Sequence, residues 1–265
     1  MVRVLLENGT GSKISRTGAA HRARRRRAIQ RRVAMKIGII GAGNIGSVLA
    51  LRFVERGHQV KIGNSRGPGT LGEVERETGA TSAELKEVVK DADVIVVTIP
   101  EAKVPNLPKD LFAGVPASTV VIDTGNYYPR QRDGRIAGIE KGSTESRWVE
   151  EQIGRPVVKA FNNIYADHLR NKGTPAGTPK RIALPVAGDD AKAKAVVMKL
   201  VDEVGFDAVD AGTLDDSWRQ QPATPVYTAD RDAEGVRAAL QQADPVRKPE
   251  WRATDRSPGD FDNPA

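Results

Sequence analysis

The chain has 265 residues, with 39% hydrophobic and only 5% aromatic residues, a length that allows one large domain or two small ones. No apolar run approaches the roughly 20 residues that cross a bilayer, which argues against a membrane enzyme. The absence of cysteine excludes disulfides, thiolate catalysis and cysteine-bound metals, and it fits a reducing cytoplasm. Because the chain has only three histidines, we expect no metal site.

The net charge of +7 is concentrated at one end of the chain. Residues 1–34 carry ten of the 41 Lys and Arg residues and one of the 34 acids, so the remainder is slightly acidic. We expect a disordered basic extension over residues 1–34. Three interpretations stay open for it. The segment is a solvated tail or the product of an upstream start codon; it binds nucleic acid or an acidic surface through residues 24–27; or it is a transit peptide. Outside this extension we expect no nucleic-acid partner.

The first ordered element is predicted to be a strand over residues 36–40, followed at once by a G-x-G-x-x-G loop. Apolar residues at helical spacing then reach Gly57, and residues 59–63 supply a second strand. In such a strand-helix-strand unit Gly41 permits the tight turn, Gly43 lets a pyrophosphate approach, and Gly46 allows the helix to pack closely. The phosphates lie at the helix N-terminus. The loop therefore predicts dinucleotide binding, with a glycine turn in an unrelated α/β protein as the alternative.

The residues after the second strand favour NADP over NAD. NAD-binding units place an acid about 20 residues past the loop, where it binds the ribose 2′-hydroxyl. Here that place holds Asn64, Ser65 and Arg66, which can all donate hydrogen bonds to a 2′-phosphate. The alternative is a polar turn with a solvated arginine.

Strands and helices alternate along the rest of the chain. Further strands are predicted at 80–81, 94–100, 119–123, 157–161, 182–187 and 206–210, and helices at 70–77, 83–90, 192–204 and 232–242. This alternation predicts an α/β fold, a doubly wound, Rossmann-like parallel sheet with a C-terminal βαβ extension. We expect an NADP-binding domain over residues 35–228, and a helix with a polar tail over residues 229–265.

Ligands of such sheets bind outside the carboxyl ends of the strands, where Thr98, Pro100 and Asn126 can contact a nicotinamide ribose. A turn held by its own side chains is the alternative for residues 123–126. Candidate proton donors are Lys159, Tyr127 and His168, although Lys159 can equally be ion-paired and His168 can lie on a surface helix. Trp218 either caps an acceptor pocket or packs in the core.

Several motifs together resemble one known family. GAGNIG and NSRGPGTL within residues 36–71, DTGNYYP at 123–129, KAFNNI at 159–164, PVAGDD at 185–190 and DSWRQQP at 216–222 are similar to the NADP-dependent deazaflavin (coenzyme F420) oxidoreductases. That family resembles in turn the oxidoreductase domain of STEAP metalloreductases. The resemblance implies that Asn44 and Ile45 line the phosphate turn, that Ser65 and Arg66 hold the 2′-phosphate, and that Pro100 and Asn126 lie at the nicotinamide end.

The resemblance implies an NADP(H)-dependent oxidoreductase that moves a hydride between the nicotinamide and a deazaflavin or flavin-like acceptor. Transfer between two stacked rings requires close approach and exclusion of water but no protein acid. Two other functions stay open: reduction of a small carbonyl or imine, which needs a proton donor, and a redox sensor that holds NADPH without turnover. The expected partner is a small-molecule hydride acceptor, and the chain is expected to be cytoplasmic and can form a homodimer.

Overall fold

The computed structural model describes residues 34–246, 259 and 261–264. Apart from Ala34, the basic extension expected over residues 1–34 lies outside the described residues, as does most of the polar C-terminal tail. No helix in the described part of the chain is both long enough and apolar enough to span a bilayer.

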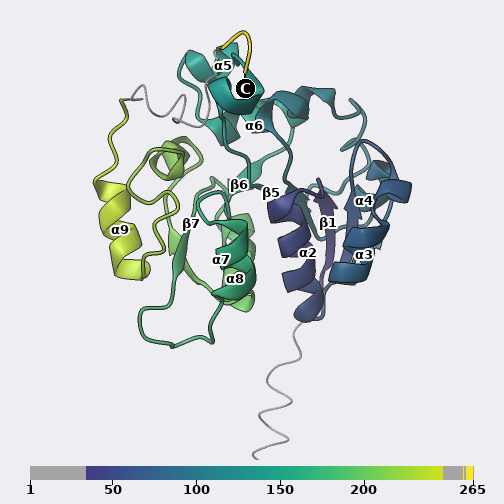
Figure 1. The fold of residues 1–265 in the computed structure, drawn as a ribbon, viewed down its shortest axis with the longest axis horizontal. Coiled ribbons are helices and arrows are strands. Elements are labelled where there is room, and N and C mark those ends of the chain that lie inside the picture. Colours follow the sequence, from purple (N-terminus) through teal and green to yellow (C-terminus); the bar gives the residue numbers. More distant parts are fainter. Residues whose placement is uncertain (1–33, 247–258, 260, 265) are drawn as a thin grey trace, which may run out of the picture. The chain divides into compact units, whose positions relative to one another are not determined.

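A six-stranded parallel sheet with the strand order β3-β2-β1-β4-β5-β6 forms the centre of the fold. Its strands β1, β5 and β6 are labelled in Figure 1. In β1, Ile37 pairs with Val60 of β2 on one side and with Val94 of β4 on the other. The order of the strands reverses between β1 and β4, and such sheets bind ligands at this switch point. The strands are β1 (Lys36–Ile40), β2 (Gln59–Gly63), β3 (Thr81–Ser82), β4 (Val94–Val97), β5 (Val120–Asp123) and β6 (Val157–Lys159).

Helices cover both faces of this sheet because neighbouring strand residues point to opposite sides. Ile39 packs in one core cluster with Phe53 of α2 and Val201 of α8, whereas Ile40 packs in a second cluster with Val88 of α4. The predicted doubly wound α/β fold is therefore confirmed. The helical elements around the sheet are α2 (Asn44–Glu55), η1 (Pro68–Thr70), α3 (Gly72–Thr78), α4 (Leu85–Val89), α7 (Ala166–Asn171) and α8 (Ala191–Glu203).

The C-terminal βαβ extension is confirmed as a second, small sheet. β7 (Ala183–Val186) and β8 (Asp207–Asp210) form a two-stranded parallel sheet of their own, connected by α8 and packed against α9 (Ala233–Gln241). A single antiparallel bridge between Lys159 and Ala187 connects this sheet to the end of β6. The parallel series expected to continue through residues 182–187 and 206–210 thus stops at β6.

The segment between β5 and β6 contains helices that the sequence patterns did not predict. α6 buries the polar residues Glu145 and Ser146 along with Trp148 and Val149, so it lacks a clean apolar stripe. The Thr144 hydroxyl accepts a hydrogen bond from the amide of Arg147 and thereby caps this helix. The elements outside the predicted pattern are η2 (Glu101–Asn106), the π-helical turn η3 (Pro129–Asp133), α5 (Ala137–Glu140), α6 (Glu145–Ile153) and η4 (Asp215–Gln220).

Candidate functional site

A cavity of about 710 Å³ lies at the carboxyl ends of β1, β2 and β4. Its wall brings together seven of the eleven predicted cofactor residues from three separate turns. The remaining wall comes from η2 and the two residues after it, from Leu85 of α4, and from Ile40, Ala42 and Ile99 beside the predicted residues. The seven predicted residues that line it are Gly41, Gly43, Asn64, Ser65, Arg66, Thr98 and Pro100.

The three glycines of the loop have three different surroundings. Gly41 has a φ of +113°, a conformation that favours glycine. A Cβ on Gly46 would overlap the Gly41 carbonyl and lie 2.8 Å from Cγ2 of Thr98, so a side chain there would force the helix away from the strands. A Cβ on Gly43 would meet nothing within 4 Å. Gly43 therefore faces open space, as expected where a ligand must approach the backbone.

The N-terminus of α2 points its first amides toward this loop. Gly43 is the N-cap, no side chain caps the helix, and its first turn contains no acid. Asn44, Ile45 and Gly46 begin α2 beside the cavity and do not themselves line it. Free amides and the helix dipole favour an anion at this end.

The turn after β2 is shaped by Asn64. Its Oδ1 accepts a hydrogen bond from the Arg66 amide at 2.9 Å, and its Nδ2 donates to Oγ1 of Thr70 at 3.0 Å. The side chain of Asn64 is thus used within the turn. Ser65 and Arg66 line the cavity, and the Arg66 side chain is exposed at its rim.

Lys103 of η2 is a cavity residue that the sequence patterns did not single out. Within the described part of the chain, neither the Lys103 ammonium nor the Arg66 guanidinium has an ion-pair partner, and no Asp or Glu lines the cavity. In the sequence, only the position of Lys103 three residues after Pro100 could have pointed to it. η2 begins directly after the strand that we expected over residues 94–100. The cavity therefore has two unpaired cations and no opposing carboxylate among the described residues.

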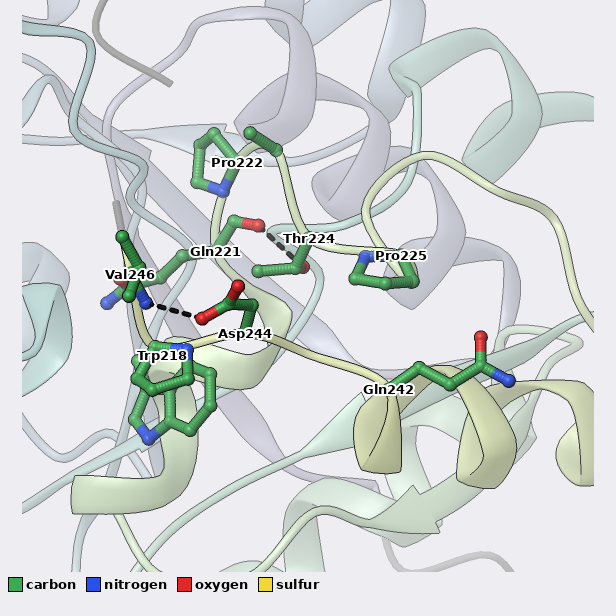
Figure 2. Close-up of a pocket in the computed structure, with 10 residues that line it drawn as sticks. Trp218, Gln221, Pro222, Thr224, Pro225, Gln242, Asp244 and Val246 are labelled. Carbon is green, nitrogen blue, oxygen red and sulfur yellow. Dashed lines mark hydrogen bonds between the residues drawn. The ribbon is translucent and has the colours of Figure 1, made fainter. Parts of the chain in front are cut away.

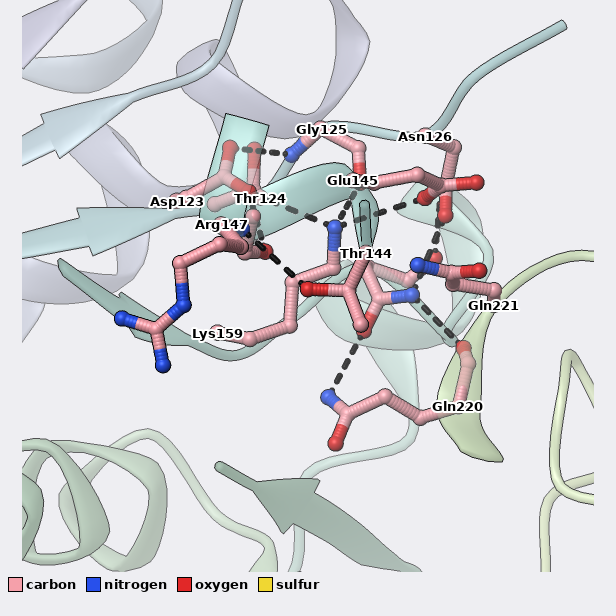
Figure 3. A network of polar contacts seen from close by, with 12 residues as sticks. Asp123, Thr124, Gly125, Asn126, Thr144, Glu145, Arg147, Lys159, Gln220 and Gln221 are labelled. Carbon is pink, nitrogen blue, oxygen red and sulfur yellow. Dashed lines mark hydrogen bonds and ion pairs between the residues drawn. The ribbon is translucent and has the colours of Figure 1, made fainter. Parts of the chain in front are cut away.

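Asn126 lies apart from the cavity wall, in a network of amide side chains (Figure 3). Its Nδ2 donates to the carbonyl of Asn162 at 2.8 Å, and its Oδ1 accepts from Nδ2 of Asn162 at 3.0 Å. Gln220 of η4 donates from Nε2 to Oδ1 of Asn162 at 2.9 Å. The network joins the turns after β5 and β6 to the C-terminal part of the chain.

Lys159 is completely buried at the end of β6 and does not line the cavity. Its Nζ lies 2.6 Å from the carbonyl oxygen of Gly125, 3.3 Å from Oδ2 of Asp123 and 3.6 Å from Oε2 of Glu145 (Figure 3). Burial alone lowers the pKa of the Lys159 ammonium, but the surrounding carboxylates outweigh burial and raise it. Of the two interpretations of Lys159 from the sequence, proton donor or ion-paired lysine, these contacts match the ion-paired lysine.

The other two candidate donors are also occupied. The Tyr127 hydroxyl donates to the carbonyl of Gly134 and accepts from the amide of Ile136, both at 3.0 Å, and burial raises the pKa of this tyrosine. His168 lies on α7, and its Nδ1 is 2.8 Å from Oδ2 of Asp230. Neither side chain lines the cavity.

Trp218 lines a separate, smaller cavity between the chain after η4 and the chain after α9 (Figure 2). This cavity has a volume of about 130 Å³, and Gln221, Pro222, Gln242 and Val246 are among its lining residues. Trp218 therefore lines a space apart from the cavity that holds the predicted cofactor residues.

Comparison with known proteins agrees with this geometry. The family model described as NADP oxidoreductase, coenzyme F420-dependent, matches residues 36–127. A crystal structure of a hypothetical protein from Sinorhizobium meliloti is 30% identical and superposes with a TM-score of 0.59, covering 78% of this chain and 96% of that one. The chain belongs to this NADP oxidoreductase family. The resemblance inferred from the motifs is thereby confirmed.

Two curated relatives are similar over part of their length. The protein YjhV of Escherichia coli K12 is 43% identical over 85 residues, which are 32% of this chain and 57% of YjhV. The metalloreductase STEAP3 of Rattus norvegicus is 27% identical over 194 residues, which are 73% of this chain and 37% of STEAP3. The matched part thus covers less than two thirds of either relative.

Proposed function

We propose that this member of the family is an NADP(H)-dependent oxidoreductase that transfers a hydride between the nicotinamide and a small-molecule acceptor of the deazaflavin or flavin type. The observation that carries the proposal is the 710 Å³ cavity, which combines a glycine loop, two unpaired cations and no carboxylate among its described lining residues. A carboxylate at the ribose end would repel a 2′-phosphate, whereas cations attract it. This lining supports NADP(H) rather than NAD(H).

The residues present fit a phosphorylated dinucleotide. Gly43 leaves room for the pyrophosphate against the backbone, and the first amides of α2 can donate hydrogen bonds to it. Ser65 and Arg66 would hold the 2′-phosphate, with Lys103 of η2 supplying a second positive charge. Asn64 contributes by fixing the turn, since its own amide is engaged there.

The nicotinamide end would lie at the turns after β4 and β5. The bound dinucleotide supplies the hydride from C4 of its nicotinamide ring. Thr98 and Pro100 would orient the ribose and ring from the cavity wall, and Asn126, fixed by Asn162, would bound the ring on the β5 side. Carbon-to-carbon hydride transfer requires that the protein orient the two rings and exclude water.

The proposed type of acceptor follows from the candidate proton donors, whose polar atoms are already hydrogen-bonded within the protein. Reduction of a carbonyl or imine requires an acid within hydrogen-bond reach of the substrate. Lys159 and Tyr127 are buried and bonded to backbone carbonyls, and neither lines the cavity. A stacked heterocycle that accepts a hydride needs no such acid, which favours the deazaflavin or flavin type of acceptor.

The proposal is tested by anaerobic oxidation of NADPH with three sets of acceptors: a deazaflavin, a flavin, and a panel of small carbonyls and imines. Steady turnover with the deazaflavin or flavin alone supports the proposal. Turnover confined to the carbonyl and imine panel assigns the reductase function instead. Tight NADPH binding without turnover on any acceptor assigns a redox sensor. Compartment and oligomeric state stay predictions, the latter measurable by light scattering.

A further inference from the structure

Four ionisable side chains from four elements meet in the interior beside the proposed nicotinamide end. Glu101, Glu145 and Lys159 are 0% exposed and Asp123 is 1% exposed. They come from η2, α6, β6 and β5 in that order. Burying so many ionisable groups is costly unless charges are matched.

The charges in this group are not matched. Lys159 is the single cation of the four residues, and its Nζ is directed to Asp123 and Glu145. Asp123 also accepts a hydrogen bond from Oγ of Ser146 at 2.6 Å. Both carboxyl oxygens of Glu101 are buried without a hydrogen-bond partner among the described residues.

We propose that the folded chain keeps Glu101 in its neutral, protonated form, and that this neutral carboxyl is a positioning residue for the turn of residues 124–126 at the nicotinamide end. The proposal deepens the hydride-transfer function proposed above and rests on it.

Burial and the acids around Glu101 favour its neutral form. Desolvation and then the charge of Asp123 raise the pKa of Glu101 well above its ordinary value, with smaller contributions from Glu145 and from Asp133 of η3, and only Lys159 opposes them. Asp133 is itself paired with Arg132 at 2.9 Å and accepts from the amide of Ala102. A charged Glu101 would be the third carboxylate around one ammonium.

The contact with Gly125 explains why the proton matters. A Cβ on Gly125 would overlap the Glu101 carboxyl, so the two groups are in direct contact. The Gly125 amide donates to Oδ1 of Asp123 at 2.9 Å, and its carbonyl accepts from Nζ of Lys159 at 2.6 Å. The backbone of Gly125 is thus held on three sides, and Asn126 is the next residue. A charge on Glu101 would compete for Lys159 and release the Gly125 carbonyl.

The first test compares thermal unfolding of the wild type, Glu101→Gln and the control Glu77→Gln from about pH 5 to about pH 9. The amide of the Glu101→Gln variant copies the neutral carboxyl, and Glu77 is an exposed acid on α3. Because the folded state keeps a proton that the unfolded state loses, raising the pH should destabilise the wild type relative to Glu101→Gln until the folded-state pKa is passed. The Tm of Glu101→Gln should therefore rise steadily above that of the wild type, while Glu77→Gln should follow the wild type. A Tm difference independent of pH, or Glu101→Gln less stable throughout, overturns the proposal.

The second test separates positioning from packing. Glu101→Ala should lower kcat by about tenfold with little change in the KM for NADPH, because the turn loses its support while the dinucleotide cavity stays intact. Glu101→Gln should restore most of that loss.

If Glu101→Ala lowers only the Tm, or if Glu101→Gln loses kcat like Glu101→Ala, the positioning role is wrong. If the wild type transfers no hydride, the proposed function fails and this role with it, while the melting comparison still decides whether Glu101 is neutral. If Glu101→Ala does not fold, Glu101→Gln alone decides: wild-type kcat with the expected Tm trend supports the proposal, and any other result opposes it.

Discussion

The ammonium of Lys159 lies 2.6 Å from the carbonyl oxygen of Gly125, two residues beyond the carboxylate of Asp123 that it also contacts. A lysine that donates to a backbone carbonyl in the interior fixes the path of the chain. Its position at the end of β6, next to the proposed nicotinamide end, is therefore explained by architecture rather than by proton transfer.

Replacing Lys159 with alanine should lower the free energy of unfolding by about 3 kcal/mol, because it leaves Asp123 and Glu145 buried without their cation. Urea unfolding followed by circular dichroism measures this. The matched control is Lys90→Ala, which removes an exposed lysine 3.7 Å from Glu87 and should cost less than about 1 kcal/mol. Equal losses in the two variants would contradict the structural role of Lys159.

Replacing Arg66 with alanine should raise the dissociation constant for NADPH by about 10- to 100-fold, because a charge-assisted contact to the 2′-phosphate is lost. Binding of NADH should hardly change. Isothermal titration of both dinucleotides measures the difference, with Arg76→Ala, an exposed arginine on α3, as the control. Parallel losses for NADPH and NADH would remove Arg66 from the 2′-phosphate site.

Lys103→Ala should weaken NADPH binding by about tenfold at low salt and by less at high salt, since an exposed cation acts through a screened charge. The control is Lys109→Ala, which removes an exposed lysine from the next turn, outside the cavity wall. Titrations at two ionic strengths test this. An effect that is the same for both lysines would mean that Lys103 contributes only to the general charge of the surface.

Two glycines of one loop should respond to alanine in different ways. Gly43→Ala should leave the Tm unchanged, because its Cβ meets nothing within 4 Å, but should weaken NADPH binding because the methyl group occupies the phosphate position.

Gly46→Ala should instead lower the Tm, since its Cβ would overlap the Gly41 carbonyl and crowd Thr98. Differential scanning fluorimetry with and without NADPH distinguishes the two. If Gly43→Ala binds NADPH as the wild type does, the phosphates do not lie against this loop.

The parts predicted best from the sequence were those with a regular apolar pattern. β4 and β5 were recognised because their Val and Ile residues follow one another directly and these strands are buried on both faces. α6 was not recognised, because its buried residues Glu145 and Ser146 are polar and give no apolar pattern. Their contacts with Lys159 and Asp123, which are distant in sequence, explain why they are buried. Lys103 was missed for a similar reason: only the fold brings η2 and the turn of Arg66 to the same cavity.

Every residue that lines the large cavity lies between positions 40 and 108, whereas the amide network of Asn126, Asn162 and Gln220 is encoded further along the chain. The residues proposed to select the dinucleotide by its 2′-phosphate therefore lie in one continuous stretch of the chain. Exchanging this stretch for the matching stretch of an NAD-binding protein is a direct way to test whether it sets coenzyme choice.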